Sequence, residues 1–350
     1  MSTPAVDAEF TFELLVCRWA ELAWPPESAD RPALVVSRQL GTQRRRWDTI
    51  VVECDPAGLA ARREFGDRTI DSDLLPVVRH APAEWAYYRN ALPDPGYDWR
   101  YVREAVHRAA ARDLVEKRKN GRRIEIRRKR PYPDWVERVV AIENKPDLDA
   151  SAAAALTDQL THDVETALAD EVWLATTRTG DRVEPALLEE FPVEVGVLTF
   201  DLNAEDADRA ASATRDEGIE TTAVRAGAAT VDWLPSSLDT AADSERFSSE
   251  EKARRRRWLA ERAYGKGWRS FTETMRPDCR YFDLRRAGRG LVPYCEAKGR
   301  CQTESECGAR CGSFEPEPPQ WRTNGWPIQG GPGQGVRTLL ERRRERARKR

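Results

Sequence analysis

Two residues at the end of an apolar run are the first in this sequence that could do chemistry. Residues 139–145 form the run Val-Val-Ala-Ile-Glu-Asn-Lys, which is typical of a buried strand. Side chains alternate between the faces of a strand, so Glu143 and Lys145 share one face. Charged groups at the end of a core strand lose water, and they are usually paired, bound to metal or catalytic. Side chains that simply reach solvent are the alternative interpretation.

A second apolar segment adds another acid. Residues 47–54 indicate a strand, and Asp48 lies near its start, directly after the basic turn of residues 41–46. If the start of this strand meets the end of the run at 139–145, Asp48 and Glu143 come together. Two or three carboxylates with open positions suit Mg²⁺ or Mn²⁺, which are hard ions that keep several waters. The sequence therefore favours a site for a divalent cation.

The element before these strands carries a further acid. Residues 10–22 have apolar side chains at roughly helical spacing, and Pro25 and Pro26 end the segment. Glu13 lies near the apolar stripe. It is either a buried acid or an ordinary solvated one.

These motifs resemble the PD-(D/E)XK nuclease superfamily, the restriction-endonuclease-like fold. Asp48 matches the acid on the second core strand, and Glu143 and Lys145 match the E-x-K of the third. The order helix, strand, strand, strand, helix, strand is similar to the family core. The sequence departs from the family pattern at Trp47, which replaces the motif proline, at polar Asn144, and in the long segment between the two motifs.

The resemblance implies both a fold and site roles. It implies an α/β protein with a mixed sheet flanked by helices. Asp48 and Glu143 would bind Mg²⁺ or Mn²⁺, Lys145 would position or activate water, and Glu13 would match the upstream acid of many members. Gln159 and Asp163, in a following helix, are similar to polar positions of the exonuclease-like branch.

Charge is distributed unevenly along the chain. The 350 residues have a net charge of −2, with 33% charged and 40% hydrophobic residues. Residues 250–350 hold 25 Lys and Arg against 13 Asp and Glu, a net +12 that leaves −14 for residues 1–249. The excess of Arg and acids over Lys resembles proteins of salt-loving microbes. In high salt, attraction between an Arg-rich tail and phosphates is weakened.

Targeting signals give a simpler expectation. The N-terminal residues lack the pattern of a signal peptide, and no apolar run approaches the length needed to span a bilayer. We therefore expect a cytoplasmic protein that does not bind a membrane.

Residues 56–131 interrupt the expected core. Residues 74–78, 84–92 and 99–113 predict three short helices, and residues 114–130 predict two strands around Asn120-Gly121. Three helices followed by a basic hairpin have the order of a winged helix. Such a unit could bind DNA, with a helix in the major groove and the hairpin along phosphates. A solvated hairpin, or a winged helix that binds protein, is the alternative.

Candidate DNA-binding residues share a positive charge and a place in a turn, helix or hairpin of this half of the chain. They are Arg44, Arg45 and Arg46 in the turn before Asp48, Arg103 and Arg108 in the third helix, and Lys117, Lys119, Arg122 and Arg123 in the hairpin. The turn arginines could touch phosphates near the metal or simply solvate the turn.

Five of the seven cysteines fall close together near the C-terminus: Cys279, Cys295, Cys301, Cys307 and Cys311. A cytoplasmic chain rarely keeps disulfides, so this density favours metal. Tetrahedral zinc needs four ligands, for which we choose Cys279, Cys295, Cys307 and Cys311, with Cys301 spare. The same four could hold a [4Fe–4S] cluster, as in some exonuclease-like members of the resembled family. Reduced thiols without metal are the third option.

The expected organisation therefore has five parts. They are a discontinuous nuclease-like core (8–55 and 132–234), a winged-helix-like insertion (56–131), a linker (235–249), a basic helix with a Cys-rich metal module (250–320) and a disordered basic tail (321–350). The favoured function is a metal-dependent nuclease acting on DNA. The alternatives are a DNA-binding protein that keeps the fold without cleavage, and an interaction protein that docks a partner through the Cys module.

Overall fold

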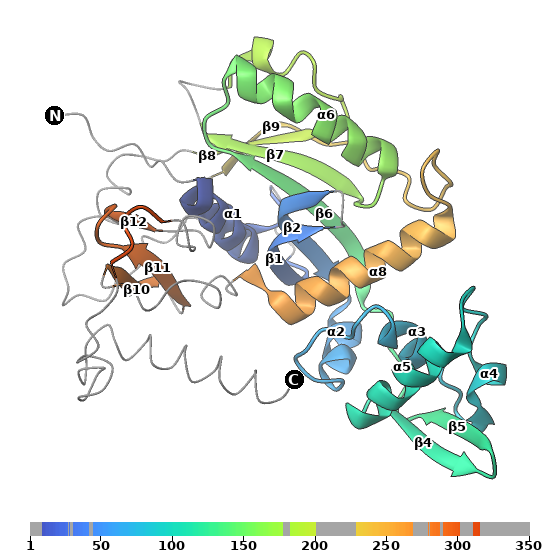
Figure 1. Ribbon diagram of the computed structural model, residues 1–350. Coiled ribbons are helices and arrows are strands. Elements are labelled where there is room, and N and C mark those ends of the chain that lie inside the picture. The colour runs from blue at the N-terminus through green and yellow to red at the C-terminus, as the bar shows by residue number, and fades with distance from the viewer. Residues whose placement is uncertain are drawn as a thin grey trace, which may run out of the picture.

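A six-stranded mixed sheet forms the centre of the molecule (Figure 1). This computed structural model describes residues 9–26, 28, 31–41, 45–177, 183–200, 229–268, 279, 281–287, 290–301 and 311–315. In sheet order the strands are β1 (Ala33–Gly41), β2 (Arg46–Cys54), β6 (Val136–Lys145), β7 (Glu171–Thr177), β8 (Gly196–Phe200) and β9 (Ala229–Trp233). Neighbours are antiparallel except that β6, β7 and β8 run parallel. The expected α/β fold with a mixed sheet flanked by helices is confirmed.

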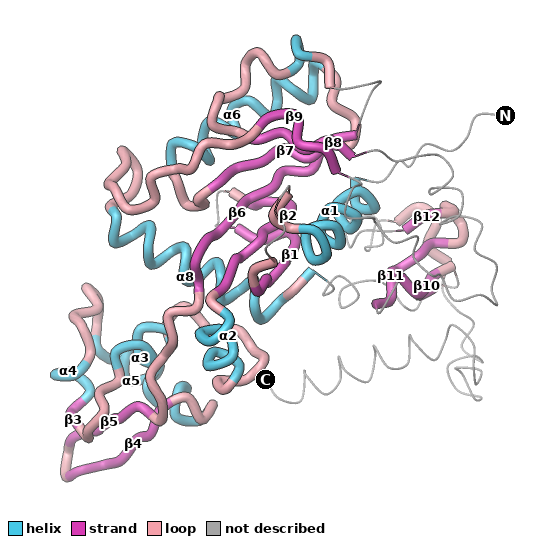
Figure 2. The backbone as a smooth tube through the Cα atoms, turned by 180° about the vertical axis from the view of Figure 1, so that it is seen from behind, coloured by secondary structure: helices cyan, strands magenta, loops and turns pink. Residues whose placement is uncertain are grey.

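Helices cover both faces of this sheet. On one face, Phe12 and Val16 of α1 (Glu9–Ala23) pack against Val140 and Ile142 of β6. On the other face lie α6 (Ala150–Thr166) and α8 (Ser249–Lys266). Figure 1 shows α8 in front of the sheet, and Figure 2, seen from behind, shows α1 in front of it. The central strands are therefore buried on both sides, which explains their continuous Val and Ile content.

The crossover between β6 and β7 is a well-capped helix. The Asp149 side chain accepts a hydrogen bond from the backbone N–H of Ala152 at 2.7 Å, which starts α6. The helix ends at Ala167, whose φ is 45°. Leu156 and Leu160 pack against Val172 and Leu174, so the helix lies on the sheet and returns the chain parallel to β6. A short 3₁₀ helix, η1 (Pro185–Leu187), precedes β8.

Residues between β2 and β6 form an insertion with its own core. Its elements are α2 (Pro56–Arg63), α3 (Leu74–His80), β3 (Ala86–Tyr87), α4 (Tyr88–Ala91), α5 (Trp99–Ala111), β4 (Val115–Asn120) and β5 (Arg123–Arg128). Val77, Val106 and Ile126 are fully or almost fully buried in this core. The hairpin around Gly121, which has a φ of 58°, is confirmed. The helix expected over 84–92 is wrong in its first half, because Ala86 and Tyr87 pair with β5 as a third strand.

The basic helix expected from residue 250 onward packs on the central sheet, whereas the sequence grouped it with the Cys-rich module. Ser248 caps α8 as expected, with its hydroxyl accepting from the Glu251 N–H at 3.3 Å. Leu259, Ala260 and Ala263 then pack on the central sheet, so α8 belongs to the core. The expected linker also contacts the core, since the N–H of Leu238 donates to the Asp170 carbonyl at 2.8 Å.

A smaller three-stranded sheet contains part of the Cys-rich segment. It comprises β10 (Phe282–Ala287), β11 (Gly290–Cys295) and β12 (Arg300–Cys301), all antiparallel. The expected tail at 321–350 lies outside the described residues. Among the helices that the structure describes, none combines the length and apolarity required to cross a bilayer.

One carboxylate joins the insertion to α8. Glu261 and Arg62 of α2 form an ion pair whose side chains are both 0% exposed, with two hydrogen bonds of 2.6 Å. Glu261 also accepts from the N–H of Ile70 at 3.1 Å and from the hydroxyl of Tyr132 at 2.5 Å. Both oxygens of the Glu261 carboxylate therefore accept hydrogen bonds, which offsets the cost of burying an ion pair.

We expect Glu261→Gln to lower the free energy of unfolding by about 3–5 kcal/mol, because it leaves the Arg62 charge buried without a partner. Urea denaturation would measure the loss. Glu251→Gln on the same helix is the matched control, because Glu251 pairs with Arg254 and Arg255 near the surface and should cost about 0.5 kcal/mol. Equal losses in the two variants would contradict a special role for the buried pair.

Candidate functional site

The start of β2 and the end of β6 bring the predicted acids together. The antiparallel ladder of these strands runs to the pair Thr49 and Ile142, so Asp48 and Glu143 come next on adjacent strands. The backbone N–H of Asn144 donates to Oδ2 of Asp48 at 3.1 Å. The Asp48 carboxylate therefore lies against the backbone between Glu143 and Lys145.

Alternation along β6 separates the charged residues from the core side. Asn144 is buried and donates from Nδ2 to the hydroxyl of Thr49 at 3.0 Å on the face that α1 covers. Glu143 and Lys145, one residue to either side of it, are half-buried and belong to the opposite face. Their common face is the one that the sequence predicts.

Glu13 is connected to Asp48 through one amide. Glu13 is 3% exposed, and its Oε2 accepts from Nε of Arg38 at 2.8 Å. The Gln39 side-chain amide donates both to Oε1 of Glu13 and, at 2.9 Å, to Oδ1 of Asp48. Glu13 is thus a buried acid at this site and not a solvated one.

The backbone of Gln39 is held in an unusual conformation. Its φ is 52°, a value that L residues rarely adopt. Nζ of Lys266, at the end of α8, donates to the carbonyl groups of Arg38 and Gln39 at 2.9 Å each. Burial and neighbouring cations lower the pKa of Lys266 to about 8. The end of α8 therefore supports the strand residue that links two carboxylates.

Arg45 joins Glu143 to a fourth acid. Its Nη2 donates to Oε2 of Glu143 at 2.8 Å and to Oδ2 of Asp163 at 2.7 Å. Burial raises the pKa of Asp163, and the Arg45 charge opposes this shift. Burial would lower the pKa of Arg45, but its hydrogen bonds and ion pairs with both acids hold it above the ordinary value.

A small polar network lies beneath the site. The Thr49 hydroxyl lies 3.3 Å from Sγ of Cys17 and accepts from Asn144. Burial raises the pKa of the Cys17 thiol to about 12, so the thiol stays protonated near neutral pH. Oδ1 of Asn144 is buried and has no hydrogen-bond partner among the described residues. Cys17 is therefore a core residue in this network, as expected for a buried thiol.

Other predicted residues lie elsewhere. Gln159 is exposed on α6, and no hydrogen bond of the described residues joins it to the three carboxylates; Asp163, one turn later, is the residue of α6 that reaches Arg45. Arg44 falls outside the described residues, and Arg46 is exposed at the start of β2. Of the three turn arginines, the structure brings Arg45 into the site.

The basic residues of the insertion differ in their partners. Arg108 is exposed and pairs with Asp73 at 2.9 Å and Asp71 at 3.4 Å. Lys117 contacts His107 at 2.7 Å. Three further predicted cations, Arg103, Lys119 and Arg122, are exposed, whereas Arg123 lies over the Tyr87 ring at 5.4 Å.

The insertion leaves the sheet at the end opposite to the carboxylates. It follows Cys54 at the end of β2 and leads into Val136 at the start of β6. Glu143 lies seven residues after Val136 along β6, which corresponds to roughly 23 Å of strand. The basic hairpin lies still further out (Figure 1).

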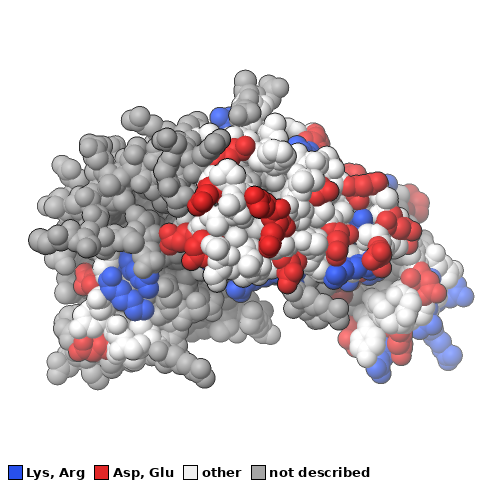
Figure 3. Space-filling view, turned by 90° about the horizontal axis from the view of Figure 1, so that it is seen from above, with Lys and Arg blue, Asp and Glu red and all other residues white. Residues whose placement is uncertain are grey.

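Charge is unevenly distributed over the described surface. Seen from above, Asp and Glu are scattered over a largely uncharged surface of the described core, while Lys and Arg appear at the end where Figure 1 places the insertion and in a patch at the opposite end (Figure 3). The core surface in this view would repel a polyanion, so an approaching phosphate chain depends on local cations.

The predicted metal module is described only in part. Cys279 and Cys295 are buried and Cys311 is half-buried, each as a free thiol. The side chain of Cys301 and all of Cys307 lie outside the described residues. Within the part of the chain that the structure describes, no three His, Cys, Asp or Glu side chains are grouped closely enough to hold a metal. The zinc or iron–sulfur site remains a prediction.

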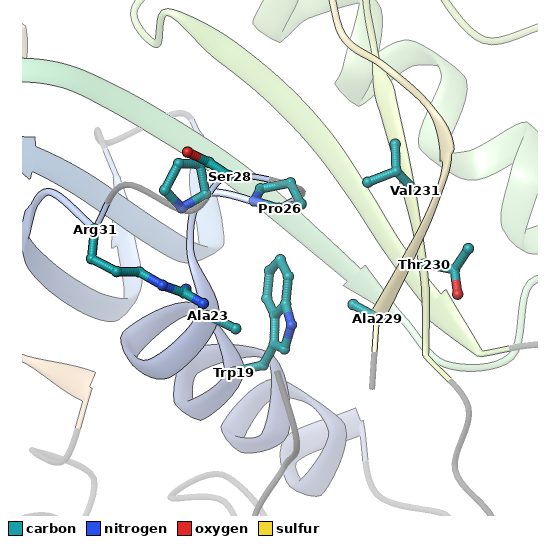
Figure 4. A pocket seen from close by; sticks show the side chains of 9 residues that line it. Trp19, Ala23, Pro26, Ser28, Arg31, Ala229, Thr230 and Val231 are labelled. Carbon is teal, nitrogen blue, oxygen red and sulfur yellow. The ribbon is translucent and has the colours of Figure 1, made fainter. Parts of the chain in front are cut away.

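A separate cavity lies between the end of α1 and the edge strand β9. It has a volume of about 210 Å³, and its lining includes Trp19, Pro26, Arg31 and Val231 (Figure 4). None of the predicted site residues lines it. The carboxylate site and this cavity are therefore different places in the fold.

Residues 35–316 match a protein family of unknown function, DUF5787. The chain belongs to DUF5787. The range matched to DUF5787 contains Asp48, Glu143 and Lys145, the whole insertion and all five C-terminal cysteines, whereas Glu13 precedes it. Comparison with curated proteins and with solved structures finds no match.

Several residues of the site were missed by the sequence analysis. Arg38, Gln39 and Lys266 carry no motif, and each acts on a residue far away in the chain or through the backbone. The polar pair Arg38-Gln39 within an otherwise apolar strand is the one signal that could have drawn attention to them.

We expect Thr49→Val to lower the free energy of unfolding by about 1–3 kcal/mol, because Nδ2 of the buried Asn144 loses its acceptor. Chemical denaturation would measure the change. Thr157→Val is the control, since the half-buried Thr157 hydroxyl only bonds the carbonyl one turn earlier in α6, and its loss should cost less than about 1 kcal/mol. An unchanged stability in Thr49→Val would show that the network does not support the site.

Proposed function

We propose that this protein is a metal-dependent nuclease that hydrolyses phosphodiester bonds of DNA. The observation that carries the proposal is the hydrogen bond from the Asn144 N–H to Asp48, which puts an acid of β2 against the Glu-x-Lys of β6. Asp48 thus lies on the strand next to Glu143 and Lys145, 96 residues before Asn144 in the chain, at one end of a buried strand pair. Such groups are costly to bury in part unless they serve a site.

The donor set fits Mg²⁺ or Mn²⁺. Asp48 and Glu143 offer hard carboxylate oxygens, and the remaining positions would be taken by water and by a phosphate oxygen, as Mg²⁺ prefers. Glu143 already attracts one cation, the Arg45 guanidinium. Glu13 is further from this role, because Arg38 and Gln39 use its oxygens. When bound, the metal would polarise the phosphodiester and lower the pKa of a water.

The chain's own groups would then do the following. Asp48 and Glu143 would hold the cation, and Gln39 and the Asn144 N–H fix the orientation of the Asp48 carboxylate. Lys145, on the face that Glu143 shares, orients the attacking water and opposes charge that builds on the phosphate oxygens.

Element order supports the resemblance to the PD-(D/E)XK superfamily. The series α1, β1, β2, β6, α6 and β7 is helix, strand, strand, strand, helix, strand, with β7 parallel to β6. The proposed acids lie on the second and third of these strands. The insertion and the Arg45 contact to Glu143 are additions to that pattern.

The insertion would contact the DNA at a distance from the carboxylates. The hairpin lies beyond the far end of β6, more than roughly 23 Å from Glu143. A bound duplex would therefore contact the hairpin at least about seven base pairs from the bond that is cleaved, given a rise of ~3.4 Å per base pair. The hairpin would anchor the duplex and not deliver groups to the reaction.

The second candidate is a DNA-binding protein that keeps this fold without cleavage. It is favoured by the guanidinium on Glu143, which occupies an oxygen that a metal would need. A third candidate, an interaction protein that uses its Cys-rich segment, rests on the cysteine density alone. Zinc, or else a [4Fe–4S] cluster, in that segment is proposed separately from the nuclease site.

We expect the full chain with Mn²⁺ to release fragments from plasmid or single-stranded DNA. Asp48→Asn, Glu143→Gln and Lys145→Met should each slow this release about a hundredfold or more, because each removes a metal ligand or a charge that acts in the transition state. Gel electrophoresis would measure it. Glu137→Gln, an exposed acid of the same strand, should keep full activity. DNA binding that survives a chelator, with no cleavage under any divalent ion, would favour the second candidate.

We expect the double variant Lys119→Glu/Arg122→Glu to bind duplex DNA at least about tenfold more weakly and with a salt dependence lower by about two phosphate contacts. Titrations at several salt concentrations would measure both quantities. Arg246→Glu/Arg254→Glu carries the same charge change on exposed residues outside the insertion. Equal weakening in both double variants would mean that net charge, and not the hairpin, controls binding.

A further inference from the structure

Arg45 forms more hydrogen bonds with Asp163 than with Glu143, and its Nη1 also donates to the Arg46 carbonyl at 2.5 Å. It donates to Asp163 three times, from Nε to Oδ1 at 2.9 Å and to Oδ2 at 3.0 Å, and from Nη2 to Oδ2 at 2.7 Å. It donates to Glu143 once, from Nη2 to Oε2 at 2.8 Å. Loss of the contact with Glu143 would leave the guanidinium with three of these four hydrogen bonds, whereas loss of the contact with Asp163 would leave it with one.

The exposed fractions of the two acids also indicate that Asp163 is the stronger partner of Arg45. The Asp163 side chain is 1% exposed, so its charge needs the guanidinium at all times. Glu143 is 11% exposed and lies beside Asp48, where a second cation could reach it. Asp163 is therefore the permanent partner of Arg45, and Glu143 is the exchangeable one.

The backbone fixes Arg45 at this place. A Cβ on Gly41 would lie 2.0 Å from the Arg45 carbonyl oxygen, so only glycine allows this close approach. The guanidinium also lies 5.7 Å from the centre of the Trp47 ring. Both the backbone and the side chain of Arg45 are therefore positioned by neighbouring residues, which keep the guanidinium against the two acids.

We propose that Arg45 is a built-in cation that competes with the divalent metal for Glu143, with Asp163 as the anchor that keeps Arg45 within reach. The inference rests on the proposed metal site of Asp48 and Glu143. In the resting site the guanidinium offsets the charge of Glu143, and a metal enters only when its concentration is high enough to take Glu143 from the guanidinium.

The guanidinium raises the metal concentration that is needed to occupy Glu143, and a change of pH does not remove the charge of the guanidinium. Arginine stays protonated at all pH values that the fold tolerates. The charge of Arg45 is therefore constant, and the metal concentration decides which of the two cations binds Glu143. The two cations repel each other at short range, and linkage makes the effect reciprocal: the metal weakens the Arg45–Glu143 contact as much as that contact weakens metal binding.

The charge-balanced variant Arg45→Met/Asp163→Asn tests this competition. It removes one positive and one negative charge, so the net charge of the site is unchanged while Glu143 loses the guanidinium that it contacts. Arg45→Met alone would leave Asp163 buried and unpaired and is expected to be unstable, so the double variant is the decisive one. Arg46→Met, an exposed neighbour, is the control.

Mn²⁺ affinity of the full-length protein would be measured by the electron paramagnetic resonance signal of free Mn²⁺, with folding checked by circular dichroism. We expect the double variant to bind Mn²⁺ on the order of tenfold more tightly than the native chain, and Arg46→Met to bind it equally well. Equal or weaker binding by the folded double variant would overturn the competition. Native binding that Asp48→Asn and Glu143→Gln leave unchanged would instead overturn the proposed metal site, which is a different result.

Discussion

The ladder between β2 and β6 is the interaction on which the rest of the structure depends. These strands are separated in the chain by residues 55–135, and their backbone hydrogen bonds bring the two ends of that segment back together. Because Val51, Val52, Val139 and Val140 are fully buried, a shift of one residue in this pairing would turn apolar side chains to the wrong face. The register that buries the valines is therefore also the register that sets Asp48 beside Glu143.

Residue patterns along the chain predicted this part of the site well. Alternation put Glu143 and Lys145 on one face, and an apolar run beside Asp48 indicated a second strand. The central sheet with flanking helices followed from the same patterns. Strand ends are visible in a sequence because apolar content, β-branched residues and charge all change at one position.

The contacts that complete the site could not be predicted, because they join residues distant in the chain. Arg45 is one of three consecutive arginines, and nothing local distinguishes the one that binds Asp163, 118 residues later. The left-handed conformation of Gln39 and its link between Glu13 and Asp48 depend on α8, which begins some two hundred residues away. Local propensity likewise missed β3, since Ala86 and Tyr87 become a strand only by pairing with β5.

The hydrogen bonds of Glu261 restrict how the insertion can move relative to the sheet. Arg62 lies where the chain leaves for the insertion and Tyr132 where it returns, and both are tied to this one carboxylate of α8, which itself packs on the core. An appendage fastened at its root on both the outgoing and the returning chain pivots much less freely than one joined by loose tethers. The insertion is therefore joined to the core at both of its ends through one buried carboxylate, so removing Glu261 would loosen the outgoing and the returning chain together.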